Sequence, residues 1–338
     1  MKKPLLFTIL LVTYSFSKAQ QLPQYTQYVF NNYLLNPAVS GIENYTDVKA
    51  GYRSQWTGLS GAPATSYLTI NAPLGTNYTQ GDAAGFGSAG GENPYSRSYS
   101  ENYMASEPHH GIGMMVVSDQ SGLITTTNID ATYAYHLGIT DRLNLSLGVM
   151  AGVERVSLNT ASATLPETQL DPALANGNNG QWKPDLGVGI WAYSADYYIG
   201  FSVQQLLKET YFSTSGSDYT QGTTVPHAFF TAGYKIFLTD EITLMPSFMV
   251  KVVKPVPVSY DINAKLSFGD RVWLGGSYRR NDAFSAMLGI NINSIINIGY
   301  AYDISTSNLR TVSNGTNEIV IGLLLNNRYH VTCPQHSF

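Results

Sequence analysis

Side chains of opposite character alternate with a period of two along many segments of this chain. Between Asn144 and Val153 every second residue is apolar, and the residues in between suit a wet or crowded interior. In Val258–Phe268 the two charged residues, Asp261 and Lys265, both fall on the alternate face. Successive side chains of a β-strand point to opposite faces, so this period predicts strands. Its persistence over about 10 residues, with charges on one face, is typical of strands in a membrane barrel.

Composition separates this interpretation from a soluble β-sandwich, whose strands alternate as well. Charged residues make up 12% of the chain, against roughly 25% in soluble globular domains. The mean hydropathy is nevertheless only −0.09, and no apolar run long enough for a transmembrane helix follows residue 20. Low charge with neutral hydropathy predicts an all-β fold, a transmembrane antiparallel β-barrel. A pI near 5.8 disfavours nucleic-acid binding.

The N-terminus has the features of a secretory signal peptide. Two lysines are followed by the short apolar stretch Leu5–Tyr14 and by small residues at Ser17 and Ala19. We expect cleavage after Ala19, because the apolar stretch is too short for a membrane anchor. Cys333 is the only cysteine, which excludes an internal disulfide. Sec export combined with a barrel predicts a multi-pass protein of the bacterial outer membrane.

The alternation predicts about 14 strands, an even number that returns both ends of the barrel to the periplasm. The predicted strands cover approximately 44–56, 62–72, 110–120, 125–136, 142–157, 182–194, 196–204, 225–238, 241–252, 257–268, 271–280, 283–291, 294–303 and 316–325. The domain organisation then comprises a signal peptide (1–19), a short N-terminal periplasmic segment or plug (20–43), the barrel (44–325) and a periplasmic tail (326–338). We expect segment 20–43 in or beside the periplasmic mouth.

The connector 75–109 does not fit the expected asymmetry of short periplasmic turns and long outer loops. It is rich in Gly, Ser, Tyr and Asn, and this topology places it on the periplasmic side. Either it is an irregular periplasmic insertion, or two strands have been missed and it is an outer loop. We favour the insertion.

From about residue 21 to the end, the sequence resembles the type IX secretion system membrane proteins of the PorP/SprF family from Bacteroidota. The most specific matches are Asn36-Pro37-Ala38-Val39-Ser40-Gly41, Gly51-Tyr52-Arg53-Ser54-Gln55-Trp56 and Gly61-Ala62-Pro63-Ala64-Thr65. The segment 75–109 departs from the family pattern, which turns directly from one strand into the next.

The resemblance implies a 14-stranded outer-membrane barrel of the type IX secretion or gliding motility machinery. It implies protein secretion and surface anchoring of a cell-surface adhesin through the adhesin's C-terminal sorting domain, and contact with the periplasmic ring of the machinery. The motif residues expected to have a structural or functional role are Asn36, Pro37, Gly41, Tyr52, Arg53, Gln55, Trp56 and Pro63.

Several polar side chains are predicted to face the lumen: Arg53, Glu154, Asp185, Lys251, Asp261, Lys265 and Arg279. They could line a binding tunnel, but we expect opposite charges to pair, because unpaired charges in a confined lumen are costly. Arg53 could hold the N-terminal segment. Bulky residues predicted to point inward indicate a filled or constricted bore: Trp191, Tyr193, Phe229, Trp273 and Met287.

Enzymatic chemistry finds no support in the sequence. The Gly-x-Gly patterns at 111–113 and 187–189 open no helix that could bind phosphate. None of the six histidines accompanies a Gly-x-Ser-x-Gly elbow, and His109-His110 has no third metal ligand nearby. We therefore predict no enzyme, no cofactor and no metal site.

Aromatic residues fall into two groups. Those near strand ends, including Trp56, Trp182, Tyr197, Tyr198 and Tyr234, suit the headgroup level of the lipid. Those in a predicted outer loop, Tyr211, Phe212 and Tyr219, are candidates for partner contact. The predicted function is that of an adhesin partner, and a channel or porin for small solutes is the alternative.

Overall fold

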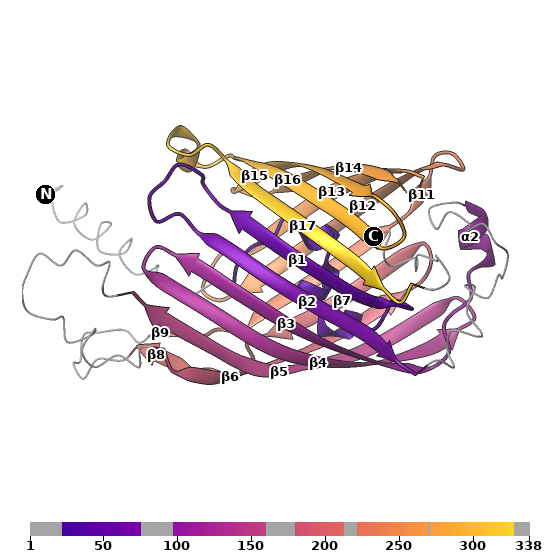
Figure 1. Cartoon of the computed structure of the whole chain (residues 1–338), viewed down its shortest axis with the longest axis horizontal. Helices are drawn as coiled ribbons and strands as arrows, with labels where there is room; N and C mark the ends of the chain where they lie inside the picture. Colours follow the sequence, from indigo (N-terminus) through magenta and orange to yellow (C-terminus); the bar gives the residue numbers. More distant parts are fainter. Residues whose placement is uncertain (1–21, 76–96, 160–179, 213–221, 270, 328–338) are drawn as a thin grey trace, which may run out of the picture.

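The computed structural model of the chain is a closed antiparallel β-barrel of 14 strands. It describes residues 22–75, 97–159, 180–212, 222–269 and 271–327. Figure 1 shows the strands tilted across the length of the barrel, with the N-terminal segment inside. No helix among these residues is long and apolar enough to cross a membrane.

The wall is formed by long strands joined in chain order. They are β1 (Thr46–Ser54), β2 (Ala64–Leu74), β3 (His109–Ser121), β4 (Ile124–Thr140), β5 (Leu143–Leu158), β6 (Trp182–Tyr193), β7 (Tyr197–Gln204), β10 (His227–Tyr234), β11 (Ile236–Phe237), β12 (Ile242–Val253), β13 (Ser259–Phe268), β14 (Val272–Arg279), β15 (Ala283–Asn291), β16 (Ile296–Ser305) and β17 (Thr316–Leu325). Outside the wall, β8 (Thr210–Phe212) and β9 (Gly222–Thr223) form a small hairpin.

Two pairings close the cylinder. The first strand, β1, pairs with the last, β17, and Arg53 lies directly opposite Glu318. On the other side β12 pairs with β10 and, after an interruption at Lys235, with β11. β10 and β11 therefore count as one wall strand, which gives the total of 14. This confirms the predicted fold class.

The predicted alternation is seen in the burial of the side chains. Leu147 and Ile262 on the outer face are both 56% exposed, whereas Met150 on the inner face is only 3% exposed. A membrane can solvate such an outer face, because hydrocarbon rather than water then surrounds the apolar side chains. The aromatic residue Tyr198 is an exception to the sequence prediction: it points into the lumen, where it is 1% exposed and stacks on Trp191.

The two ends of the barrel differ. We call the end where β1 begins, and where Asp141 and Arg142 join β4 to β5, the turn end. The opposite end, where β5 and β7 end and β6 and β10 begin, is the loop end. In Figure 1 the turn end is on the right and the loop end on the left.

The described part of the insertion 75–109 packs against the turn end. It contains the short helix α2 (Arg97–Asn102), and Ala105 N–H donates to Asp141 O at 2.7 Å. Asn144 Nδ2 donates to Tyr103 Oη at 2.7 Å. The segment joins the end of β2 to the start of β3 at the turn end, and its last residue, His109, is the first of β3.

Replacing residues 76–107 with a two-residue Asn-Gly turn should leave barrel assembly intact. Leu74 already pairs with His110, so a tight turn can join β2 to β3. Heat modifiability on a gel, in which the folded barrel migrates apart from the heated chain, measures the outcome. Loss of the folded band would show that the insertion is required for folding.

Candidate functional site: the plugged lumen

The N-terminal residues Leu22–Tyr45, which we call the lumen segment, lie inside the barrel. Tyr28, Ala38 and Tyr45 are each at most 2% exposed. The segment begins near the loop end, where Leu22 N–H donates to His227 Nε2 at 3.0 Å. It ends at the turn end, where β1 starts. The segment thus runs the length of the lumen, which differs from the expected position at the periplasmic mouth.

The lumen segment is folded into three single turns of 3-10 helix, η2 (Gln27–Val29), η3 (Asn32–Leu34) and η4 (Pro37–Val39). The Asn36 side chain caps the last turn by accepting from Ala38 N–H at 3.0 Å. Proline at the first position of η4 suits a helical turn, because its fixed φ is compatible and its missing N–H is not needed there. The same proline disfavours a helical conformation for Asn36, so η3 cannot continue into one longer helix.

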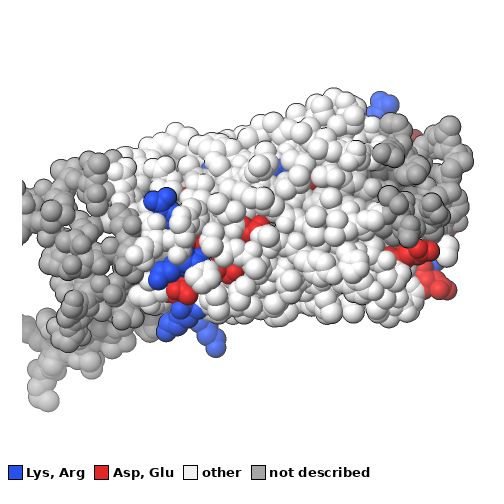
Figure 2. All heavy atoms as spheres, turned by 60° about the horizontal axis from the view of Figure 1, so that its bottom comes forward, with Lys and Arg blue, Asp and Glu red and all other residues white. Residues whose placement is uncertain are grey.

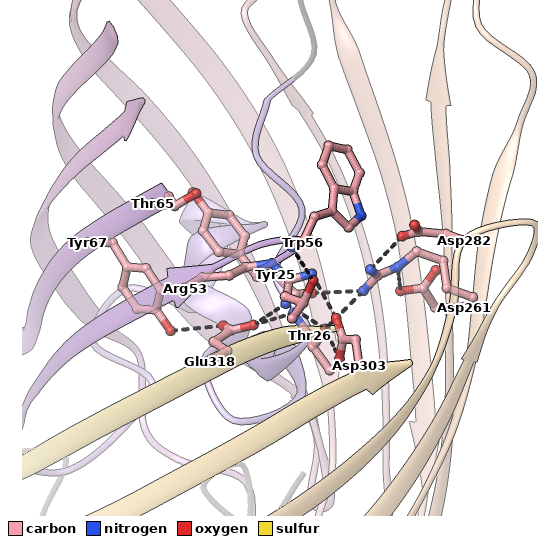
Figure 3. Close-up of polar contacts among 12 residues, drawn as sticks. Tyr25, Thr26, Arg53, Trp56, Thr65, Tyr67, Asp261, Asp282, Asp303 and Glu318 are labelled. Carbon is pink, nitrogen blue, oxygen red and sulfur yellow. Dashed lines mark hydrogen bonds and ion pairs between the residues drawn. The ribbon is translucent and has the colours of Figure 1, made fainter. Parts of the chain in front are cut away.

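Arg53 is the centre of a buried polar network at the loop-end half of the lumen (Figure 3). Its guanidinium donates from Nη1 to Glu318 at 2.9 Å and from Nη2 to Asp303 at 2.8 Å. Nη1 also donates to Thr26 Oγ1 at 3.0 Å, and Thr26 N–H donates to Glu318 at 2.8 Å. Arg53 therefore contacts the lumen segment directly while it joins three strands of the wall.

Arg279 extends this network across the bore. It forms ion pairs with Asp261 and Asp282, each at 3.0 Å. Its Nη2 also approaches Tyr25 O and Thr26 Oγ1, both at 3.4 Å. Two arginines and two carboxylates, Glu318 and Asp303, thus contact Thr26, and Asp261 and Asp282 are joined to it through Arg279. Opposite charges pair within this network, as expected.

A second set of anchors holds the lumen segment at the turn end. His136 Nε2 donates to Ser40 O at 2.8 Å, and Ser146 Oγ donates to Ala38 O at 2.7 Å. The His136 ring stacks on that of His109, with centroids 4.5 Å apart. His109 Nε2 lies 3.2 Å from Gly41 O. Neither histidine is placed to act on a substrate, since both contact the backbone of the segment.

Glycines in the wall let the lumen segment approach closely. A Cβ on Gly111 would overlap the carbonyl of Ser40, and one on Gly189 would overlap the Asn36 side chain. Gly41 itself has a φ of +71°, a conformation that favours glycine. The Gly-x-Gly patterns at 111–113 and 187–189 are thus explained by close packing.

Aromatic and apolar side chains fill the rest of the bore. Trp191, Tyr193, Phe229, Trp273 and Met287 point inward, and each is at most 4% exposed. Phe30 of the lumen segment lies against Trp273, with ring centroids 6.0 Å apart. Two cavities that described residues line beside the segment have volumes of about 30 Å³ each.

The other polar residues predicted in the lumen are buried there but lie apart from the Arg53 network. Glu154 accepts from Asn128 Nδ2 at 2.9 Å. Asp185 is 5% exposed. Lys251 donates to Leu22 O at 3.1 Å, and Lys265 Nζ lies 5.4 Å from the centre of the Trp273 ring.

The remaining predicted residues have varied positions. Tyr52 is on the outer face and is 50% exposed. Gln55 N–H donates to Pro63 O at 2.9 Å, and Trp56 N–H donates to Thr316 Oγ1 at 3.1 Å, so these residues shape the β1–β2 connection at the loop end. Of the partner-contact candidates, Tyr211 and Phe212 belong to β8, and Tyr219 lies outside the described residues.

The sequence analysis did not single out Thr26, Asp282, Asp303 or Glu318. Asp303 and Glu318 alternate in phase with the inward faces of their strands, and that signal could have identified them as lumen residues. Nothing in the local sequence marks Thr26, because its role depends on the path of the lumen segment through the barrel.

Solved structures similar to this chain are outer-membrane barrels of low sequence identity. A FadL homologue of Pseudomonas aeruginosa has 10% identity and a TM-score of 0.46, over 89% of this chain and 94% of that one. Omp33 of Acinetobacter baumannii has 8% identity and a TM-score of 0.44, over 85% of this chain and all of that one. These values carry no functional argument. No curated protein matches the chain.

A family comparison is more informative. The model of the type IX secretion system membrane protein PorP/SprF matches residues 17–323. The match includes the lumen segment, the wall strands up to the last two residues of β17, and both residues that centre the polar network, Arg53 and Arg279. The chain therefore belongs to the PorP/SprF family of type IX secretion system membrane proteins, and it is a multi-pass β-barrel of the outer membrane.

Proposed function

We propose that the protein is a non-enzymatic partner of a secreted adhesin. It binds the adhesin's C-terminal sorting domain by protein–protein contacts and helps to anchor it at the cell surface. Family membership already implies association with the type IX secretion machinery. The proposal adds that the secreted partner is an adhesin and that the protein acts by binding rather than by catalysis.

The observation that supports this function best is the filled lumen. The lumen segment is bonded to the wall at both ends, through Leu22 and Ser40, and by Arg53 between them. Two cavities that described residues line beside it have volumes of about 30 Å³ each. In a barrel filled in this way, the two ends and the outer wall are the surfaces available for binding. This favours a protein that binds partners over a solute channel.

The two ends suit different contacts. Bacterial barrels carry short turns toward the periplasm and longer loops toward the outside, so the loop end faces the surroundings. An adhesin held at the surface would meet the loop end, including the β8–β9 hairpin. The insertion 75–109 at the turn end would face the periplasmic ring of the machinery.

Isolation of the tagged full-length chain from detergent-solubilised envelopes tests this function. Mass spectrometry of the eluate should find one large secreted protein that retains its C-terminal domain. Changing Tyr211, Phe212 and Tyr219 together to alanine should lower its recovery by roughly tenfold or more, because aromatic contacts dominate interface energies.

The variant that lacks residues 76–107 is the matched control. It alters the opposite end of the barrel, so the purified variant should bind the adhesin as well as the intact chain does when the two proteins are mixed after purification, whatever its effect on contact with the ring. Isolation of the intact chain without any secreted protein would contradict the proposed function. Equal losses from both variants would contradict the assignment of the adhesin to the loop end.

A further inference from the structure

The exposed carboxylates of the described residues are confined to the turn end of the barrel, whereas exposed cations lie at both ends. Every exposed carboxylate lies at the turn end: Glu101, Glu107, Asp141, Asp240 and Glu241. Five exposed cations lie at the loop end, and we call them the cationic collar: Arg155, Lys208, Lys254, Arg280 and Arg310. On the face in Figure 2, Lys and Arg at the loop end, on the left, lie beside several carboxylates, and further carboxylates lie at the turn end on the right.

The carboxylates nearest the collar do not neutralise it. Glu209 and Asp282 are partly exposed carboxylates beyond the strand ends there, and a third, Asp119 near the end of β3, accepts a hydrogen bond from Thr65 Oγ1. Glu209 lies 3.6 Å from Lys183, and Asp282 lies 3.0 Å from Arg279. Neither partner belongs to the collar, so among the described residues this end keeps an excess of exposed positive charge.

Two cations of the collar lie over aromatic rings. The Arg155 guanidinium carbon is 5.8 Å from the centre of the Trp182 ring, and that of Arg280 is 5.4 Å from the Tyr260 ring. Trp182 is 47% exposed, as expected of a ring at the headgroup level. An arginine held on a ring is pre-oriented and keeps its planar donors free for phosphate oxygens.

We propose that the cationic collar binds the phosphate groups of the outer-leaflet glycolipid, the lipid A portion of lipopolysaccharide. Charge complementarity favours this ligand, because its phosphates lie at the level where strands meet loops. Its acyl chains can pack against the apolar wall below, where Val153 and Leu186 are 38% and 39% exposed. A protein partner would meet the same collar only where lipid is absent.

Native mass spectrometry of the full-length barrel with diphosphorylated lipid A tests the proposal. The triple change Arg155→Gln, Lys254→Gln and Arg280→Gln should weaken lipid A binding by roughly 100-fold, given the attraction of each cation to an anionic lipid surface. The matched control changes the turn-end cations Arg97, Arg142 and Arg271 to glutamine and should bind like the intact chain.

Two further measurements need no variant. Lipid A from which both phosphates have been removed should bind the intact barrel as weakly as the triple variant binds the natural lipid. Millimolar inorganic phosphate should not displace lipid A, because the acyl chains contribute to binding. Equal binding of dephosphorylated lipid A, equal losses from both triple variants, or complete displacement by free phosphate would each overturn the proposal.

Discussion

Deletion of residues 22–43, with the signal peptide and cleavage site retained, should convert a silent barrel into an ion-conducting one. A barrel of 14 strands leaves a bore wide enough for solutes once nothing occupies it. In the intact protein the lumen segment occupies that bore, with Tyr28 and Ala38 almost fully buried. Planar-bilayer recordings should show discrete current steps for the deletion variant and none for the intact chain.

A gel test of heat modifiability establishes first that the deletion variant folds. If it does not, a protease site between Tyr45 and Thr46 allows the segment to be cut from the folded barrel and washed out with urea. A synthetic peptide that covers residues 22–43 should then suppress the current. Steady conductance by the intact chain would instead favour the solute channel.

Arg53→Met should lower the free energy of unfolding by about 3–5 kcal/mol, the usual cost of removing one partner from a buried charge cluster. The change leaves Glu318 and Asp303, which are 0% and 2% exposed, without this guanidinium. Urea titration of the refolded barrel, followed by tryptophan fluorescence, measures the loss.

Two comparisons separate the charge of Arg53 from its shape. Arg53→Lys keeps the positive charge, but a lysine cannot reach both carboxylates and Thr26 together. The stability of this variant should therefore lie between that of the intact chain and that of Arg53→Met. Arg155→Met removes an exposed arginine from the outer wall and should change stability by no more than about 0.5 kcal/mol. A loss for Arg53→Met no larger than that for Arg155→Met would contradict the role assigned to the network.

The strands could be predicted from the sequence because each has a lipid face and a lumen face. That contrast gives a signal within about 10 residues, and the predicted strand 316–325 has the bounds of β17. The ion pairs between side chains of distant strands could not be predicted in the same way. Arg53 and Glu318 are 265 positions apart, and they meet only because β1 pairs with β17.

The path of the lumen segment was also beyond local prediction. Its turns are short, and its apolar residues face several walls at once, so no period appears between Leu22 and Tyr45. Asn36-Pro37 correctly indicates an end to helical structure there. It gives no indication that the Asn36 side chain also donates to Ile190 O in the wall.

The network around Arg53 bridges the seam between the first and last strands. Thr26 bonds to side chains from β1, β16 and β17, and the chain between Thr26 and β1 already fills the bore. The side-chain hydrogen bonding at the seam is therefore complete only when residues 22–45 are inside the bore. Arg53 thus couples the closure of the cylinder to the seating of its own N-terminal residues.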